Sequence, residues 1–394
     1  MRDEMKKVPR LRFRGFQEDW ELCKLGDVAD HFEYGLNASA IEYDGKNKYL
    51  RITDIDDSSR KFIQNKLTSP NINVEEASNY ILTVGDILFA RTGASVGKTY
   101  RYDIKDGKVY FAGFLIRARI KDSFDSEFVY WTTLTDRYNT FIKIMSQRSG
   151  QPGINAKEYS SFNILIPNIK EQQKIGAFLK KIDDTIALHQ RKLEQLKELK
   201  KAYLQVIFPV KDERVPKLRF AAFEEGWELR KLGDITKIST GKLDANAMVE
   251  NGKYDFYTSG IKKYRIDVPA FEGPAITIAG NGATVGYMHL ADNKFNAYQR
   301  TYVLQEFVVD RSFLFSEIGN KLPKKINQEA RTGNIPYIVM DMLTELKLSI
   351  PQDEAEQSKI GSFFKQIDKT ITLHQNKLEQ LKDLKTSYLQ NMFI

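Results

Sequence analysis

Residues 174–208 read KIGAFLKKIDDTIALHQRKLEQLKELKKAYLQVIF, and residues 359–393 read KIGSFFKQIDKTITLHQNKLEQLKDLKTSYLQNMF. At a constant offset of 185, 24 of the 35 positions are identical, so the two stretches are copies of one segment. Neither copy contains a proline or a glycine beyond its second turn, which is typical of a long uninterrupted helix. Two copies in one chain indicate a tandem repeat.

Apolar residues recur in both copies at alternating steps of four and three, the spacing of a heptad a/d seam. The seam consists of Ile175, Leu179, Ile182, Ile186, His189, Leu193, Leu196, Lys200, Tyr203 and Ile207 in the first copy, and of Ile360, Phe364, Ile367, Ile371, His374, Leu378, Leu381, Lys385, Tyr388 and Met392 in the second. A helix of this length spans roughly 60 Å, too long for its stripe to be covered by one small domain. The pattern therefore predicts that the two copies pair as an antiparallel two-helix coiled coil within the chain.

The polar seam positions are interpreted as layers that set the register of the pair. A metal role for His189 and His374 is the alternative, but no cysteine or carboxylate shares their face. A second alternative is that each long helix packs only on its own neighbouring domain.

Each long helix follows a proline and a cap sequence, Asn168 with Glu171 in the first copy and Asp353 with Glu356 in the second. A capping residue followed three positions later by glutamate predicts a reciprocal cap, in which each side chain binds the other residue's backbone N–H.

The chain has 394 residues, enough for two or three domains, and 60 Lys and Arg against 52 Asp and Glu give a formal charge of +8. A basic excess suits a nucleic-acid partner without proving one. The sequence contains no long apolar run and no hydrophobic signal core, and its single cysteine, Cys23, cannot form an internal disulfide. A cytoplasmic protein with no membrane contact is expected.

A second repeated segment precedes each body of the chain: residues 8–27 read VPRLRFRGFQEDWELCKLGD and residues 215–234 read VPKLRFAAFEEGWELRKLGD. Fourteen of twenty positions match at an offset of 207, so each half contains a signature, a variable body and a long helix. The expected divisions are 1–17 (N-terminal segment), 18–167 (first domain), 168–212 (central helix and linker), 213–351 (second domain) and 352–394 (C-terminal helix). The fold class is α+β, with two mixed α/β bodies separated by the coiled coil.

The bodies diverge in sequence but share a pattern of strands, glycine-bounded turns and helices. Strands are predicted at 81–90, 114–120 and 162–166 in the first body and at 275–279, 302–305 and 346–350 in the second. Helices are predicted at 128–145 and 313–322. If the long helices pair antiparallel, the N-terminal signature should lie beside the end of the C-terminal helix.

Residues 93–99 read GASVGKT, one residue short of a phosphate-binding P-loop, and the second copy, GATVGYM at 282–288, lacks the Lys and Thr. Residues 280–286 read GNGATVG, one residue too many for a dinucleotide motif, and the first copy has Arg91 about where Gly280 stands. No amino-methyltransferase motif, nuclease metal cluster or histidine-based triad can be assembled, so no catalytic residue and no metal site is expected. Each of these segments is interpreted as a tight turn whose polar residues face a ligand.

Binding to duplex DNA is the function that remains, because two dissimilar bodies can read two stretches of one long ligand. Polar and basic loop residues are the candidate DNA contacts. They are Arg91, Thr92, Ser95, Lys98, Arg101, Gln147, Arg148 and Gln151 in the first body, and Asn281, Thr284, Tyr287, Gln299, Arg300, Lys324, Lys325, Asn327, Arg331 and Asn334 in the second. For any one of them, a solvated loop residue is the alternative.

The chain resembles the specificity subunits of type I restriction-modification systems. The resemblance rests on both signatures, on the segment GDILFARTGASVGK at 85–98, and on the Ile-Pro then E-Q-x-K-I-G entry to each long helix. The resemblance implies a non-catalytic subunit with two target recognition domains that read a split, asymmetric site on double-stranded DNA. It also implies two adenine-N6 modification subunits and two restriction subunits as partners. S-adenosylmethionine, ATP and Mg²⁺ would be used by those partners, and no cofactor would be bound by this chain.

A repeated scaffold offers the same surface twice and should bind two copies of one partner. The exposed faces of the long helices and the two KLGD sequences are the hypothesised docking surfaces. The competing functions are a stand-alone DNA-modifying enzyme and a coiled-coil scaffold that binds no DNA.

Overall fold

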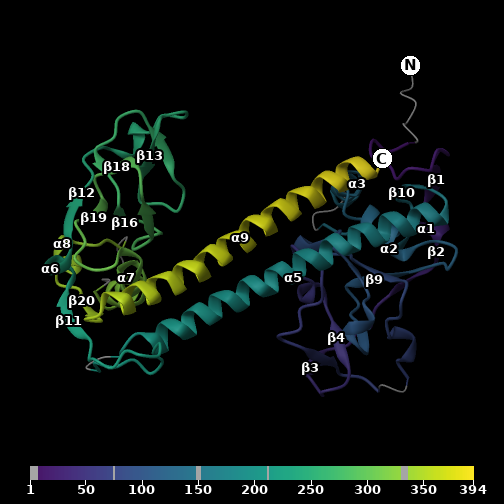
Figure 1. Ribbon diagram of the computed structural model, residues 1–394. Coiled ribbons are helices and arrows are strands. Elements are labelled where there is room, and N and C mark those ends of the chain that lie inside the picture. The colour runs from purple at the N-terminus through teal and green to yellow at the C-terminus, as the bar shows by residue number, and fades with distance from the viewer. Residues whose placement is uncertain (1–7, 74–75, 148–151, 211–212, 330–335) are drawn as a thin grey trace. The chain divides into compact units, whose positions relative to one another are not determined.

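The computed structural model describes residues 8–73, 76–147, 152–210, 213–329 and 336–394 (Figure 1). The chain divides into two compact units, unit 1 with residues 1–189 and 377–394, and unit 2 with residues 190–376. The two long helices, α5 (Ile169–Ile207) and α9 (Glu354–Met392), each have 39 residues and contribute one end to each unit. Both fall within one residue of the predicted helices 168–208 and 353–393.

The remaining elements begin and end alike in the two halves, and they differ in the segments before β6 and before β16. In the first half they are β1 (Glu21–Lys24), α1 (Leu25–Val28), β2 (Ala29–Tyr34), β3 (Ala40–Glu42), β4 (Lys48–Leu50), η1 (Ile52–Asp54), β5 (Thr68–Pro70), η2 (Ser78–Tyr80), β6 (Asp86–Ala90), η3 (Gly93–Ser95), β7 (Thr99–Arg101), η4 (Ile104–Asp106), β8 (Val109–Phe111), β9 (Leu115–Ile120), α2 (Ser126–Thr132), α3 (Asp136–Ser146), α4 (Ala156–Ser160) and β10 (Asn163–Ile166). In the second they are β11 (Glu228–Lys231), α6 (Leu232–Ile235), β12 (Lys237–Thr240), η5 (Ala245–Ala247), β13 (Tyr254–Tyr257), β14 (Tyr264–Ile266), β15 (Phe271–Glu272), β16 (Ala275–Ala279), β17 (Met288–Ala291), β18 (Lys294–Ala297), β19 (Thr301–Gln305), α7 (Arg311–Glu329), α8 (Met340–Thr344) and β20 (Lys347–Ile350).

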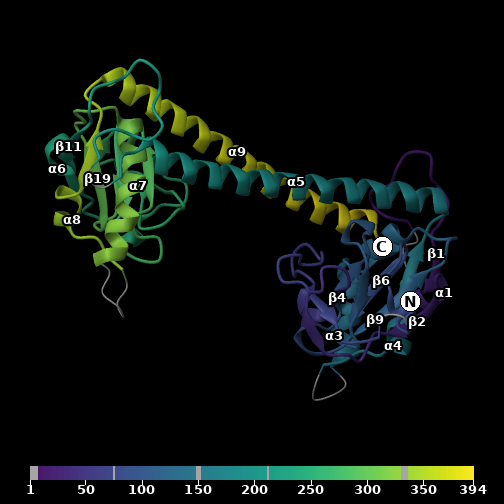
Figure 2. The same cartoon turned by 90° about the horizontal axis from the view of Figure 1, so that it is seen from below.

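A four-stranded antiparallel sheet forms the centre of each unit, in the order β2-β9-β6-β7 in unit 1 and β12-β19-β16-β17 in unit 2. One face of the unit 2 sheet packs against α7, as Figure 2 shows, and the equivalent face in unit 1 packs against α2 and α3. The predicted strands are confirmed, with β16 at the predicted bounds and β6 shorter than predicted. The mixed α/β fold class is therefore confirmed for both bodies.

The helix predicted at 128–145 is broken into α2 and α3, whereas α7 in unit 2 continues to Glu329. Thr133 and Thr135 bind backbone carbonyls three residues earlier through their hydroxyl groups, and the Thr135 side chain caps the first turn of α3. Threonines that bind the local backbone in this way compete with the helical hydrogen bonds, which explains the break.

The signature forms a strand that the sequence analysis did not predict. β1 pairs antiparallel with β10, and β11 pairs with β20. Trp20 and Trp227, just before these strands, are almost fully buried, as are Leu25 and Leu232 of the KLGD sequences. The conserved spacing between the two halves therefore reflects packing of the signature into each core.

The start of each long helix is held by an arginine of the signature. Arg12 Nε and Nη2 donate to the two carboxylate oxygens of Glu171 at 2.6 and 2.8 Å, and Arg219 donates to Glu356 at 2.7 and 2.7 Å. Both glutamate side chains are 0% exposed. The predicted reciprocal caps are therefore wrong in both copies. Asn168 accepts from the Glu171 N–H, but the Glu171 carboxylate binds Arg12. Asp353 accepts from the Ala355 N–H, and the Glu356 carboxylate binds Arg219.

The glutamine and the glycine of the E-Q-x-K-I-G sequence each contact the neighbouring backbone or side chains at the entry to the long helix. Gln172 accepts from the Asp125 N–H at 3.0 Å and donates to the Pro167 carbonyl at 2.8 Å. A Cβ atom on Gly176 would lie 2.6 Å from Asp125 Oδ1, so only glycine permits this approach of α5 to the start of α2. Gly361 meets Asp310 in the same way in unit 2.

The lysines of the seam form the polar layers that the sequence predicted. In unit 1, Lys385 of α9 pairs with Asp183 of α5 at 2.6 Å; in unit 2, Lys200 of α5 pairs with Asp368 of α9 at 2.6 Å. These four residues are related by the sequence offset of 185, so the same ion pair is built twice.

Aromatic contacts complete the seam, Phe178 with Tyr388 in unit 1 and Tyr203 with Phe363 in unit 2. The start of α5 contacts the end of α9 in unit 1, and the end of α5 contacts the start of α9 in unit 2, so the helices pair antiparallel. All of the predicted seam residues are buried or partly buried. The coiled-coil prediction is confirmed within each unit.

The end of each long helix lies in the core formed by the other half of the sequence. Phe393 contacts Trp20 and Phe128 in unit 1. Phe208 contacts Trp227 and Phe364 in unit 2. The alternative in which each helix packs only on its own domain is therefore wrong.

The signature also binds the end of the other half's helix through its backbone. The Leu11 N–H donates to the Asn391 carbonyl at 2.8 Å, and the Leu218 N–H donates to the Val206 carbonyl at 2.9 Å. The prediction that the N-terminal signature lies beside the end of the C-terminal helix is confirmed.

Replacing Arg12 by alanine should destabilise unit 1 by about 3–5 kcal/mol, because it leaves the Glu171 carboxylate buried without its counter-ion. The measurement is denaturant unfolding followed by tryptophan fluorescence in a Trp227→Phe background, where the remaining tryptophans are both in unit 1.

Lys180→Ala is the matched control, since the Lys180–Asp184 pair is solvent-exposed and should contribute less than about 1 kcal/mol. Equal losses in the two variants would show that the buried pair does not stabilise the helix entry.

Candidate nucleic-acid interface

Several loops meet at one end of the central sheet in each unit. In unit 1 the end of β6 lies between the start of β9 and the start of β7, and the end of β2 lies next to the start of β9. We call this region the loop end. It comprises residues 34–36, 91–98, 113–114 and 152–156 in unit 1, and residues 240–243, 280–287, 298–300 and 336–338 in unit 2.

The P-loop-like turn is a structural turn. Gly93 and Gly97 have φ angles of 69° and 82°, and Gly282 and Gly286 have φ angles of 86° and 83°, so the glycine spacing follows from the backbone conformation. The Gly97 N–H donates to the Ala90 carbonyl at 3.0 Å. The Gly97 N–H, a backbone donor that a P-loop would offer to a phosphate, is thus used within the turn.

The loop ends of the two units share a backbone. The Arg91 N–H donates to the Phe114 carbonyl at 3.0 Å, and the Gly280 N–H donates to the Arg300 carbonyl at 2.8 Å. A second pair of hydrogen bonds also corresponds: the Gly93 N–H donates to the Pro152 carbonyl, and the Gly282 N–H donates to the Pro336 carbonyl. The side chains at these positions differ: Tyr34 corresponds to Thr240, Arg91 to Gly280, Thr92 to Asn281, Ser95 to Thr284, Lys98 to Tyr287 and Phe114 to Arg300.

In unit 1, the structure brings together Arg91, Thr92 and Ser95 at the loop end, all partly exposed. Lys98 and Arg101 are different. The Lys98 ammonium is buried, donates to the Ile55 carbonyl at 3.1 Å and pairs with Asp57 at 2.5 Å. Lys98 therefore holds the 52–57 segment against the sheet and does not offer a charge to DNA.

Arg101 lies beyond the loop end, on β7, and pairs with Glu127 of α2 at 2.6 Å. Burial raises the pKa of Glu127, and the charge of Arg101 opposes this rise. Arg101 thus neutralises a mostly buried carboxylate, and it is a poor candidate for a DNA contact.

In unit 2, Asn281 and Thr284 bind a neighbouring loop. Asn281 accepts from the Ser259 hydroxyl at 2.5 Å, and the Thr284 hydroxyl donates to the Ser259 carbonyl. Gln299 and Arg300 lie at the same loop end and are exposed. Arg300 has no ion pair or side-chain hydrogen bond with any residue in the described ranges, so its charge is available to an external anion.

Other candidates lie on helices. Lys324, Lys325 and Asn327 are on the second half of α7, where Lys325 pairs with Glu329. Gln147 follows α3 and is exposed. Arg148, Gln151, Arg331 and Asn334 lie outside the described residues.

Four residues at or beside the loop ends were not predicted from the sequence: Tyr34, Phe114, Tyr337 and, bound to Asn281 and Thr284, Ser259. Tyr34, Phe114 and Tyr337 are exposed aromatic side chains. Each stands next to a strand end or an isolated bridge, so an exposed aromatic residue at the end of a predicted strand was the available signal.

Burial shifts the pKa values of two titratable groups outside the loop ends. Burial lowers the pKa of His289, which contacts the Gly260 carbonyl, and burial raises the pKa of Cys23 to about 11. Within the described residues, no three His, Cys, Asp or Glu side chains gather at a possible metal site. None of the helices in the same residues is long and apolar enough to cross a membrane.

A family model described as the type I restriction modification DNA specificity domain matches residues 17–198 and 224–383, one match in each half of the chain. The chain belongs to this family. The two matches follow the internal repeat, and each includes the central sheet and most of one long helix.

Relatives in the type I specificity family match in part or along most of the chain. The type I restriction enzyme EcoDI specificity subunit of Escherichia coli is 32% identical over 167 residues, which are 42% of this chain and 36% of that protein. The MjaVIII specificity subunit of Methanocaldococcus jannaschii is 23% identical over 408 residues, covering 93% of this chain and 90% of that protein.

The family fold is also found in a solved structure. The crystal structure of a type I restriction-modification system S subunit from M. genitalium has a TM-score of 0.74 and 16% identity to this chain, and the match covers 98% of this chain and 99% of that one. At this identity the similarity concerns the fold.

Proposed function

We propose that this chain is the DNA-recognition subunit of a type I restriction-modification complex, and that each unit reads one half of a bipartite, asymmetric site on double-stranded DNA. The observation that carries the proposal is the pair of loop ends, which share a backbone and differ in side chains. Polar, basic and aromatic residues on loops are suited to base edges and phosphates. Two readers with different side chains at equivalent positions should read different sequences.

The two units share a second feature that supports two copies of one partner. Exposed apolar residues occur at equivalent positions in both halves: Val8 and Val215, Leu11 and Leu218, Leu22 and Leu229, Leu188 and Leu373, and Leu199 and Leu384. Exposed apolar residues that recur in a repeat indicate a surface used twice. We propose that they contact two adenine-N6 modification subunits.

The KLGD sequences contribute less to this surface than the sequence predicted. Leu25 and Leu232 are buried, and a Cβ on Gly26 would lie 3.1 Å from Ser160 Cβ. Leu22 and Leu229, just before each KLGD sequence, are the exposed residues. The docking surface therefore moves from KLGD to the preceding strands and the long helices.

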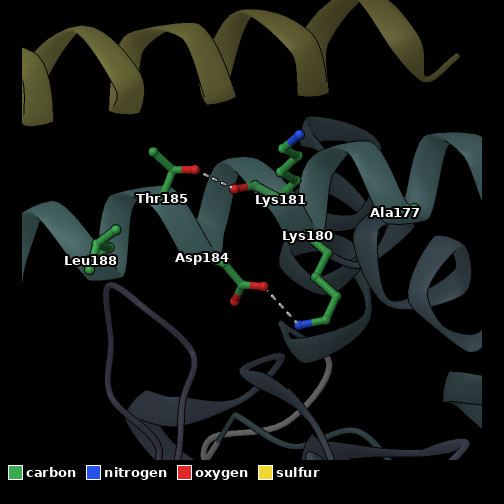
Figure 3. A pocket seen from close by; sticks show the side chains of 6 residues that line it. All are labelled: Ala177, Lys180, Lys181, Asp184, Thr185 and Leu188. Carbon is green, nitrogen blue, oxygen red and sulfur yellow. Dashed lines mark hydrogen bonds and ion pairs between the residues drawn. The ribbon is translucent and has the colours of Figure 1, made fainter.

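Figure 3 shows the exposed face of α5 in unit 1. A shallow hollow of about 340 Å³ is lined there by Ala177, Lys180, Lys181, Asp184, Thr185 and Leu188. All of the lining residues come from one helix, and the Lys180 ammonium and Asp184 carboxylate are 3.2 Å apart. A face of this kind, with Leu188 bordered by a charged pair, suits a protein partner better than a small molecule.

The chain is proposed to act without catalysis of its own, in the cytoplasm. The modification subunits would use S-adenosylmethionine, and two restriction subunits would use ATP and Mg²⁺. The names of the curated relatives, which are specificity subunits, support this division of labour.

Exchanging residues 28–166 for the same region of a relative should change one half of the methylated site and leave the other half unchanged. The measurement is a map of methylated adenines in DNA exposed to the complex assembled with each chain. Changes in both halves would contradict independent reading.

The chain incubated alone with DNA and labelled S-adenosylmethionine should transfer no methyl group, and transfer would contradict its non-catalytic role.

Leu188→Lys and Leu373→Lys should each remove one modification subunit from the complex, because a charge on an apolar contact costs binding free energy, and the double variant should bind none. Native mass spectrometry counts the copies. Ile104→Lys is the control, since Ile104 is exposed but has no repeated counterpart among the exposed apolar residues. A wild-type complex with a single modification subunit would refute the two-copy surface.

A further inference from the structure

Arg91 occupies an unusual place at the loop end of unit 1. Its guanidinium carbon lies 5.0 Å from the centre of the Tyr34 ring and 6.0 Å from the centre of the Phe114 ring. The rings belong to residues that are 42% and 57% exposed, so they stand at the surface on either side of the arginine. Cation–π attraction therefore positions the guanidinium without neutralising it.

The guanidinium has no polar partner among the residues that the structure describes. Arg91 Nε is buried and donates to no acceptor, and no ion pair or side-chain hydrogen bond joins Arg91 to any residue within the described ranges. The other arginines nearby are occupied: Arg101 pairs with Glu127, and Arg117 and Arg119 bind Asp86 or Glu33. Arg91 is thus a charged donor group that is held in place and left for an external acceptor.

The backbone of Arg91 is fixed on both sides. Its N–H donates to the Phe114 carbonyl at 3.0 Å, and its carbonyl accepts from the Ile154 N–H at 2.9 Å. With the backbone in the sheet end and the side chain against two rings, little conformational freedom remains to be lost on binding. Such preorganisation favours a contact that depends on geometry.

From these observations, and resting on the proposed function, we propose that Arg91 is a specificity-determining residue that reads a guanine in the half-site of unit 1, with Tyr34 and Phe114 as its positioning residues. The guanidinium fork matches O6 and N7 of guanine in the major groove. A phosphate could accept the same fork, but a phosphate contact carries no sequence information.

Unit 2 supports a base contact over a phosphate contact. The position equivalent to Arg91 is Gly280, where a Cβ atom would lie 2.3 Å from the Arg300 carbonyl oxygen, so no arginine fits there. The structural contacts are the same in both units. A phosphate contact, which does not depend on the DNA sequence, would be expected to recur in both units as well. Arg91 instead belongs to the set of residues that differ.

The test uses complexes assembled from the full chain and modification subunits, with wild-type chain, Arg91→Ala, Arg91→Lys or Phe114→Ala. Each complex methylates a random-sequence DNA pool, and the methylated sites are sequenced. Arg91→Ala should abolish the preference for guanine at one position of one half-site, a loss of roughly 5- to 150-fold in discrimination. All other positions should be unchanged, including the whole second half-site, which also shows that the chain is folded.

Phe114→Ala should reduce the discrimination at that same position and no other, which a merely structural role would not produce. Arg91→Lys should retain part of the preference, because lysine can contact guanine without the fork. Lys105→Ala, which removes an exposed charge at the opposite end of β7, should change no position.

Two outcomes would overturn the assignment. An unchanged motif with Arg91→Ala would show that Arg91 reads no base, and an equal loss on all sequences would identify a phosphate contact. The proposed function fails in a different way, namely if the wild-type complex methylates the pool without any sequence preference.

Discussion

Both units depend on one packing constraint: the end of each long helix closes the core of the unit formed by the other half of the sequence. Phe208, directly after α5, stacks on Phe364 with ring centres 5.7 Å apart. The ring centres of Phe393 and Phe128 are 5.3 Å apart. Burial of a phenylalanine is among the larger contributions that one side chain makes to a core. Each unit therefore needs both halves of the chain, which explains why the helices remained alike after duplication.

The same constraint separates the residues that hold the fold from those that can vary. The buried Arg–Glu pairs, the glutamine contacts, the glycines of the helix entries and the Lys–Asp layers are repeated residue for residue. The loop-end side chains are not needed by these contacts. Neither Arg91 nor Arg300 belongs to a buried apolar cluster, so the two loop ends were able to diverge.

The sequence predicted the long helices well because their heptad period is local and unbroken. It also predicted the strands on either side of the glycine turns. It was wrong about the glutamates of the helix caps, because Glu171 is bound by Arg12, which lies 159 residues away in the sequence. Local cap patterns give no sign of such a competitor.

The candidate site was harder to predict for a related reason. Lys98 fits a phosphate contact by sequence, but the fold buries it against Ile55 and Asp57. Tyr34 and Phe114 were missed because their position beside Arg91 depends on the order of strands β2, β9 and β6. Strand order in an antiparallel sheet is a long-range property, whereas the residue types at strand ends are visible locally.

Hydrogen–deuterium exchange of the Phe208→Ala variant is the most direct test of the shared cores. Phe208 follows the first long helix, but the structure predicts faster exchange in unit 2, in β11, β20 and the start of α9, with unit 1 elements α2 and β10 unchanged. Faster exchange confined to unit 1 would show that each helix supports only its own half of the sequence, and would contradict this account.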